Sequence, residues 1–138
     1  MKFTITGEPV AQGRPRFTTA NGFPRAYDPA KSSDWKNYAK MVAASRMAGK
    51  PLMDGPLSLS VCVYRSIPSS WSKKKTAEAI EGRLRPITKP DLDNYVKCAK
   101  DALSGIVWKD DSQVVAFHEP FGKFYSETPR VEIEIKEL

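Results

Sequence analysis

Hydrophobic residues alternate with polar ones in several short segments of the chain. Phe3 and Ile5 stand between polar neighbours, and the stretch "LSLSVCVYRSI" repeats the same alternation over a greater length. A period of two is typical of a β-strand with one buried face. Strands are predicted at residues 1–7, 57–67, 114–117 and 130–135.

Elsewhere the apolar residues recur at intervals of three and four. In the most regular case Leu92, Val96, Ala99 and Leu103 fall on one face of a helix, and Gly105 follows as a stop signal. Helices are predicted at residues 32–49, 71–81 and 91–104. In the first of them Trp35 and Tyr38 belong to the predicted apolar stripe.

The segment "EPVAQGRPRFTTANGFPRAYDP" separates the first strand from the first helix and is rich in proline and glycine. It predicts a long loop or a hairpin with a tight turn at Asn21-Gly22. The whole order is strand, hairpin, helix, strand, helix, helix, strand, strand. This order predicts a single α+β domain over residues 1–138, a small mixed β-sheet with helices mainly on one face.

The charge and the residue composition favour some classes of function and argue against others. Lys and Arg number 22 against 16 acids, for a net charge of +6, which suits nucleic acid or an anionic membrane surface as a partner. No apolar run approaches the ~18 residues of a membrane span. No signal peptide is visible at the start, so Cys62 and Cys98 are expected to be reduced thiols, although one disulfide remains open. The lone His118 argues against a histidine-based dyad or zinc site.

The stretch "KPDLDNYVKCAKDALSGIVWKDDSQVV" concentrates acids in this basic chain. Each acid has an ordinary structural explanation. Asp91 and Asp93 suit the start of a helix, where a carboxylate complements the free N–H groups. Asp93, Lys97 and Asp101 are spaced as a helix-surface ion-pair ladder. The pair Asp110-Asp111 suits a turn.

Taken together, the acids also fit a metal site. Carboxylate oxygens are the ligands that Mg²⁺ and Mn²⁺ prefer, with waters and substrate phosphates completing the shell. A nearby lysine inside a basic surface suits metal-assisted attack on a phosphodiester.

The motif "DLDNYVKCAKDAL" followed by "WKDDSQV" resembles the RusA family of Holliday-junction resolvases, which are common in phages and prophages. The family pattern is Asp-x-Asp-Asn-x-x-Lys, then Asp-Ala-Leu, then Asp-Asp-x-x-Val. "GRPRF" at residues 13–17 is similar to the amino-terminal arm of many phage-type members. The resemblance implies a RusA-like fold and a Mg²⁺-dependent endodeoxyribonuclease, with Mn²⁺ able to substitute. It implies a homodimer that resolves four-way DNA junctions by paired symmetric nicks in the cytoplasm of a bacterial host.

The resemblance also assigns roles to residues. It implies that Asp91, Asp93 and Asp111 hold the metal, and that Lys97 stabilises charge on the phosphate or positions the water. Weaker claims remain for three further residues. Asn94 is expected to orient a carboxylate, Asp101 to pair with Lys97 or Lys100, and Asp110 to be the alternative to Asp111 as a ligand.

Basic residues outside the motif are candidates for phosphate contacts: Arg14, Arg16, Arg25, Lys73, Lys74, Lys75, Arg83 and Arg85. The lysine run is equally typical of a solvated helix face. Two other functions compete with the nuclease. One is a non-catalytic nucleic-acid-binding module with structural acids, and the other is a protein–protein adaptor that uses the Trp35 and Tyr38 stripe.

Overall fold

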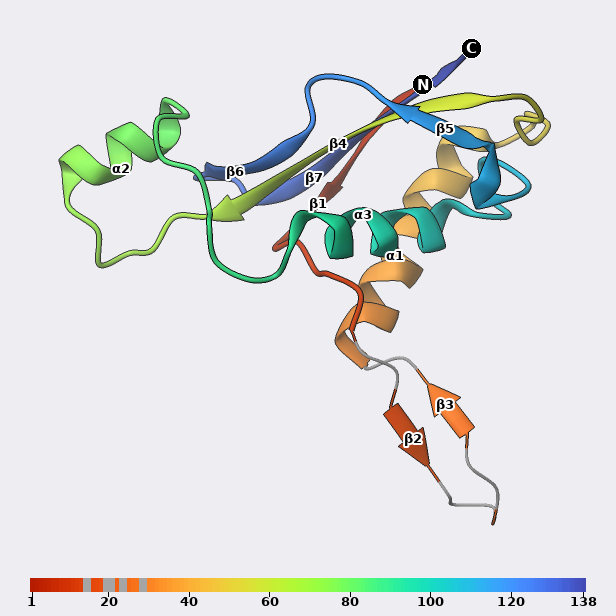
Figure 1. Ribbon diagram of the computed structural model, residues 1–138, viewed down its shortest axis with the longest axis horizontal. Helices are drawn as coiled ribbons and strands as arrows, with labels where there is room; N and C mark the ends of the chain where they lie inside the picture. Colours follow the sequence, from red (N-terminus) through yellow and green to blue (C-terminus); the bar gives the residue numbers. More distant parts are fainter. Residues whose placement is uncertain (14–15, 19–21, 23–24, 28–29) are drawn as a thin grey trace.

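The computed structural model describes residues 1–13, 16–18, 22, 25–27 and 30–138. It is an α+β domain in which helices pack against one face of a mixed sheet, as the sequence predicted (Figure 1). The elements are β1 (Lys2–Thr6), β2 (Arg16–Thr18), β3 (Arg25–Tyr27), α1 (Ala30–Met47), β4 (Leu57–Ser66), α2 (Lys73–Ile80), α3 (Leu92–Leu103), the 3₁₀ turn η1 (Asp111–Gln113), β5 (Val114–Phe117), β6 (Gly122–Ser126) and β7 (Arg130–Glu137).

Strand β4 is the centre of the sheet. It pairs antiparallel with β7, which pairs antiparallel with the edge strand β1. Along its other edge β4 pairs parallel with β5 and then, further along, with β6. The strand β6 corrects the sequence prediction, which placed residues 118–129 in the connection between two final strands. The predicted hairpin is present as the antiparallel pair β2 and β3, whereas Asn21 of its predicted turn lies outside the described residues.

The hydrophobic core lies between the sheet and the two helices α1 and α3. Alternate residues of β4, such as Leu59 and Val61, are fully buried on this face. From α1 the core receives Trp35 and Ala39, but not Tyr38, which is 43% exposed and bonds to the Thr6 hydroxyl. Tyr38 is therefore not part of the apolar stripe predicted for this helix. Burying one large apolar side chain contributes roughly 1.5–3 kcal/mol, so this layer supplies most of the stabilisation.

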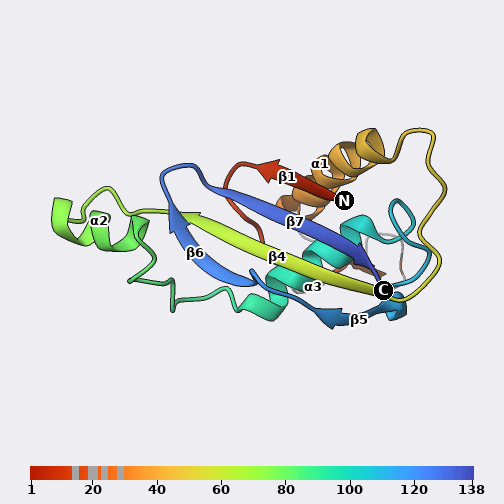
Figure 2. The ribbon, with the colours of Figure 1, turned by 90° about the horizontal axis from the view of Figure 1, so that it is seen from above.

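None of the three described helices packs on the opposite face of the sheet, which Figure 2 views from above. That face is polar. The ring of His118 lies there, with Nδ1 2.7 Å from the Ser58 hydroxyl and Nε2 3.0 Å from Glu134. The hydrogen bond with His118 is the main cause that lowers the pKa of Glu134. His118 is thus a packed residue that follows the end of β5.

Cys62 and Cys98 are both buried and no disulfide joins them. Burial raises the pKa of the Cys62 thiol. In the part of the chain that the structure describes, no helix has the length and apolar character needed to span a bilayer.

Candidate active site

The helix α3 begins at Asp91, whose side chain is not used to cap it. The Asp91 carbonyl accepts hydrogen bonds from the backbone N–H groups of Asn94 (3.1 Å) and Tyr95 (3.3 Å). Its side chain makes no capping hydrogen bond. The carboxylate of Asp91 is exposed. The helix-capping explanation for this acid therefore does not hold.

The apolar stripe of α3 decides which residues face outward. Tyr95, Val96 and Ala99 are buried against the core. The spacing of three and four residues then places Asp93 and Lys97 on the outer face of the same helix. Lys100 and Asp101 follow one turn later, so four charged side chains share this face.

The two adjacent aspartates after α3 have different environments. Asp110 caps η1: its carboxylate accepts the Ser112 backbone N–H at 2.9 Å and the Ser112 hydroxyl, while Gln113 completes a capping box. The hydrogen bond from the Ser112 hydroxyl is the main cause that lowers the pKa of Asp110. This carboxylate is committed to the turn.

Asp111 instead faces the outer side of α3. One of its oxygens, Oδ1, accepts the indole N–H of Trp108 at 2.9 Å. Trp108 is fully buried, so it holds the Asp111 carboxylate at a fixed position on the core. Of the two acids that the sequence left as alternatives, Asp111 is therefore the one available to a ligand.

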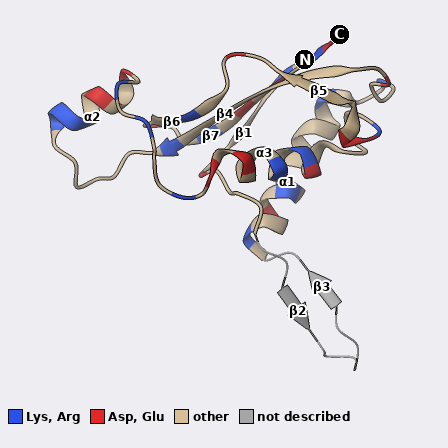
Figure 3. Ribbon diagram, in the orientation of Figure 1, with Lys and Arg blue, Asp and Glu red and all other residues tan. Residues whose placement is uncertain are grey.

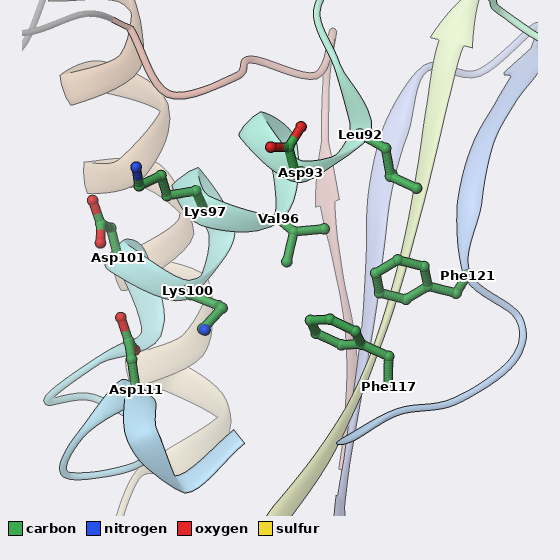
Figure 4. Close-up of a pocket in the computed structure, with 9 residues that line it drawn as sticks. All are labelled: Leu92, Asp93, Val96, Lys97, Lys100, Asp101, Asp111, Phe117 and Phe121. Carbon is green, nitrogen blue, oxygen red and sulfur yellow. The ribbon is translucent and has the colours of Figure 1, made fainter. Parts of the chain in front are cut away.

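These elements enclose a cavity of about 570 Å³, shown in Figure 4. Its lining comprises Leu92, Asp93, Val96, Lys97, Lys100, Asp101, Asp111, Phe117 and Phe121. The charged side chains of α3 and η1 form one side, and the rings of Phe117 and Phe121, with centroids 4.7 Å apart, form the other. The cavity thus presents carboxylates, amines and an aromatic surface together.

The structure brings together three of the four residues predicted for catalysis. Asp93, Lys97 and Asp111 line the cavity, while Asp91 lies at the start of α3 outside the lining. Asp101 pairs with Lys36, with its Oδ2 3.4 Å from Nζ, and not with Lys97 or Lys100 as expected. The predicted ion-pair ladder along α3 is accordingly absent from the ion pairs of the described residues.

The acids suit a magnesium site of the open kind. Among the residues that the structure describes, no three acidic, histidine or cysteine side chains converge closely enough to form a complete metal cage. Mg²⁺ is usually held by one or two carboxylates, with waters and substrate phosphates as the other ligands. The carboxylates of Asp93 and Asp111, which both line the cavity, fit that mode of binding, in which the substrate completes the site, whereas Asp91 at the start of α3 is outside the lining.

The predicted phosphate contacts lie in three environments. Lys73, Lys74 and Lys75 are exposed on the first turn of α2, where Lys75 also lies over the Trp71 ring at 4.1 Å. Arg83 pairs with Glu81, and Arg85 lies over the Phe124 ring at 3.9 Å. The side chains of Arg14, Arg16 and Arg25 are outside the described part of the structure.

Basic residues also occur outside the cavity lining. Figure 3 shows Lys and Arg on α2, along the segment that leads into α3, and on α3 itself.

Sequence reasoning did not identify Lys100, Phe117 or Phe121 as site residues. A signal existed for Lys100, which follows Lys97 by three residues on one helix face. For the two phenylalanines the sequence offered none, because their position depends on how β5 pairs with β4.

The fold and the cavity define a small basic α+β protein whose carboxylates and lysines suit chemistry on phosphodiesters. Comparison with known proteins identifies the family. The family model described as endodeoxyribonuclease RusA matches residues 6–136, and the chain belongs to that family. Membership supports an endodeoxyribonuclease role on branched DNA, of the kind that resolves Holliday junctions.

The chain is also similar to a bacterial protein of unassigned role. It is 53% identical over 140 residues to "Uncharacterized protein YqaN" of Bacillus subtilis (strain 168). The match covers 100% of this chain and 96% of that protein. This similarity extends over the whole domain and is not limited to the acidic motif.

Proposed function

We propose that the protein is a Mg²⁺-dependent endodeoxyribonuclease that resolves four-way DNA junctions by paired symmetric nicks in a bacterial cytoplasm. The observation that carries this proposal is the cavity in which Asp93, Lys97 and Asp111 lie together. Family membership supports the endonuclease role. Mn²⁺ is expected to substitute, because it prefers the same oxygen ligands.

The contacts of each residue indicate whether it would bind the metal or stabilise charge on the phosphate. Asp91, Asp93 and Asp111 would hold the metal, and Trp108 keeps one Asp111 oxygen in place while the other remains open to the cavity. When bound, Mg²⁺ would neutralise the phosphate and supply an activated water. Lys97 is exposed in the cavity and is in none of the ion pairs of the described residues. Its ammonium group is thus available to stabilise charge on the phosphate.

Two symmetric nicks require two sites. Each chain has one such cavity among its described residues, so a homodimer with twofold symmetry supplies the pair. The edge strand β5 offers a surface for this contact, because Val115 is 62% exposed and is not part of the cavity lining. Trp35, which the adaptor function would use as a contact surface, is buried in the core.

The decisive experiment is cleavage of an end-labelled four-way junction with Mg²⁺ and with EDTA. We expect nicks at symmetric positions in two opposite strands, seen only with the metal. Asp93→Asn should abolish them. Asp54→Asn is the matched control, since Asp54 pairs with Lys109 away from the cavity lining and should be dispensable. Tight junction binding without any cleavage in Mg²⁺ or Mn²⁺ would instead establish a non-catalytic binding module.

A further inference from the structure

Lys123 lies outside the acidic motif, on β6, yet its side chain reaches the segment that enters α3. Its Nζ donates hydrogen bonds to the carbonyl oxygens of Thr88 and Pro90, both at 3.0 Å. Arg65 on β4 donates to the same Thr88 carbonyl at 3.1 Å and to the Thr88 hydroxyl at 3.2 Å. Two cations therefore hold the residues that immediately precede Asp91.

Strand pairing explains why the two cations meet. Val63 is opposite Lys123, and Arg65 is opposite Tyr125, in the parallel ladder of β4 and β6. Side chains two residues apart on a strand share a face, so Lys123 and Arg65 point to the same side of the sheet. Val63 is buried in the core under the helices. The cations thus stand at the end of the sheet face on which α3 begins.

Arg85 fixes the strand from which Lys123 projects. Its Nε donates to the Lys123 carbonyl, and its guanidinium lies over the Phe124 ring. The Arg85 side chain passes directly over Gly122, where an added Cβ would be 2.5 Å from Nη2. A side chain at this position would have to displace the end of the Arg85 side chain. The hydrogen bond from Arg85 therefore holds the backbone of Lys123 in place.

The hydrogen bonds of Lys123 bear directly on the position of Asp91. The Pro90 carbonyl belongs to the peptide unit that contains the Asp91 nitrogen, so Lys123 orients the backbone on one side of Asp91. On the other side, the Asp91 carbonyl is held by the first turn of α3. The carboxylate itself makes no capping bond that would fix it. The backbone therefore sets the point from which the Asp91 side chain extends.

We propose that Lys123 is a positioning residue that sets Asp91 for metal binding, with Arg65 in support. This inference rests on the proposed function, in which Asp91 is a metal ligand. Groups that orient a metal ligand typically change metal affinity or activity 10–100-fold when removed. The ion pairs of the described residues include neither cation with a carboxylate.

The test compares Lys123→Met with Lys123→Arg, which retains the donors, and with Lys136→Met on the far end of β7 as a control. Mn²⁺ binding to the DNA-free protein is measured by electron paramagnetic resonance. We expect the half-saturating Mn²⁺ concentration to rise about 10-fold or more in Lys123→Met and to stay near the wild-type value in the other two. Cleavage should fail at low Mg²⁺ and recover at high Mg²⁺. Junction affinity in Ca²⁺ should be unchanged, because Lys123 binds carbonyls and not DNA.

The outcomes separate the two proposals. Wild-type Mn²⁺ affinity in a folded Lys123→Met protein overturns the positioning role. Absence of Mn²⁺ binding and of cleavage in the wild type overturns the proposed function instead. Where Lys123→Met does not fold, Arg65→Met takes its place. This variant keeps the Pro90 bond and should raise the half-saturating concentration by a smaller factor, and no rise at all contradicts the proposal.

Discussion

The neighbouring acids Asp110 and Asp111 should respond in opposite ways to substitution. Asp110 caps η1 through Ser112, whereas Asp111 lines the cavity and accepts the indole N–H of buried Trp108. Asp111→Asn should therefore abolish cleavage and leave the fold intact, since the amide oxygen still accepts the indole bond. Asp110→Ala should lower the melting temperature and leave cleavage close to the wild-type rate.

The hydrogen bond to Trp108 sets the size of the stability effect. Asp111→Asn replaces a charge-assisted bond by a neutral one, which costs about 1 kcal/mol. Asp111→Ala leaves the indole N–H of a fully buried residue without its partner, which costs about 1–3 kcal/mol. In a domain of this size 1 kcal/mol corresponds to roughly 4 °C in melting temperature. The alanine variant should be the less stable of the two.

The stability part is measured by urea unfolding and thermal melts, and the catalytic part by cleavage of a labelled junction. The lowered pKa of Asp110 adds a pH test. A group with a depressed folded-state pKa stabilises the protein above its unfolded pKa, about 3.9 for Asp, and loses this as the pH falls. The difference between wild type and Asp110→Ala should thus be present at pH 7 and shrink below about pH 4. Full activity in Asp111→Asn, or complete inactivity in a folded Asp110→Ala, would refute the assignment.

Three further predictions concern the metal, the phosphate and the DNA surface. Asp91→Asn and Asp93→Asn should each abolish cleavage. Junction affinity in Ca²⁺ should be kept or increased, because loss of an anion favours DNA binding. If either variant cuts the junction at nearly the wild-type rate, that residue is not a metal ligand. Lys97→Ala should stay inactive in saturating Mg²⁺, since its charge acts on the phosphate, and recovery with added metal would contradict this role. The double variant Arg14→Ala/Arg16→Ala removes four arginines from the proposed homodimer. It should reduce the slope of log affinity against log salt by about 3.6, or roughly 0.9 per lost contact, between 50 and 300 mM salt, and an unchanged slope excludes the arm from the electrostatic contact.

Local patterns were enough to predict most of the fold. The strand β4 and the helix α3 each have a strong period, and their apolar faces are those that the structure buries. The strand β6 was missed because "GKFYS" has weak alternation, begins with Gly122 and follows closely after Pro120. It becomes a strand through its pairing with β4 and the Arg85 contact, which are long-range interactions. Tertiary context of this kind overrides local propensity in strands more than in helices.

The same distinction applies to the site. The spacing of the motif placed Asp93 and Lys97 on one helix face, and both line the cavity. Spacing could not determine whether Asp91 or Asp110 is used as a cap, because that depends on side-chain rotamers and on local turn geometry. Nor could it reveal Lys123, which is 30 or more residues from the carbonyls it binds.

The hydrogen bonds of the structure sort the acids of the motif into two kinds. Asp101 and Asp110 have partners within the protein, Lys36 and Ser112, which compensate their charge. Asp91 has no capping bond, and Asp111 leaves one oxygen free while Trp108 holds the other. Asp93 and Asp111 line the cavity beside Lys97, and this division of the acids supports the cation site proposed above.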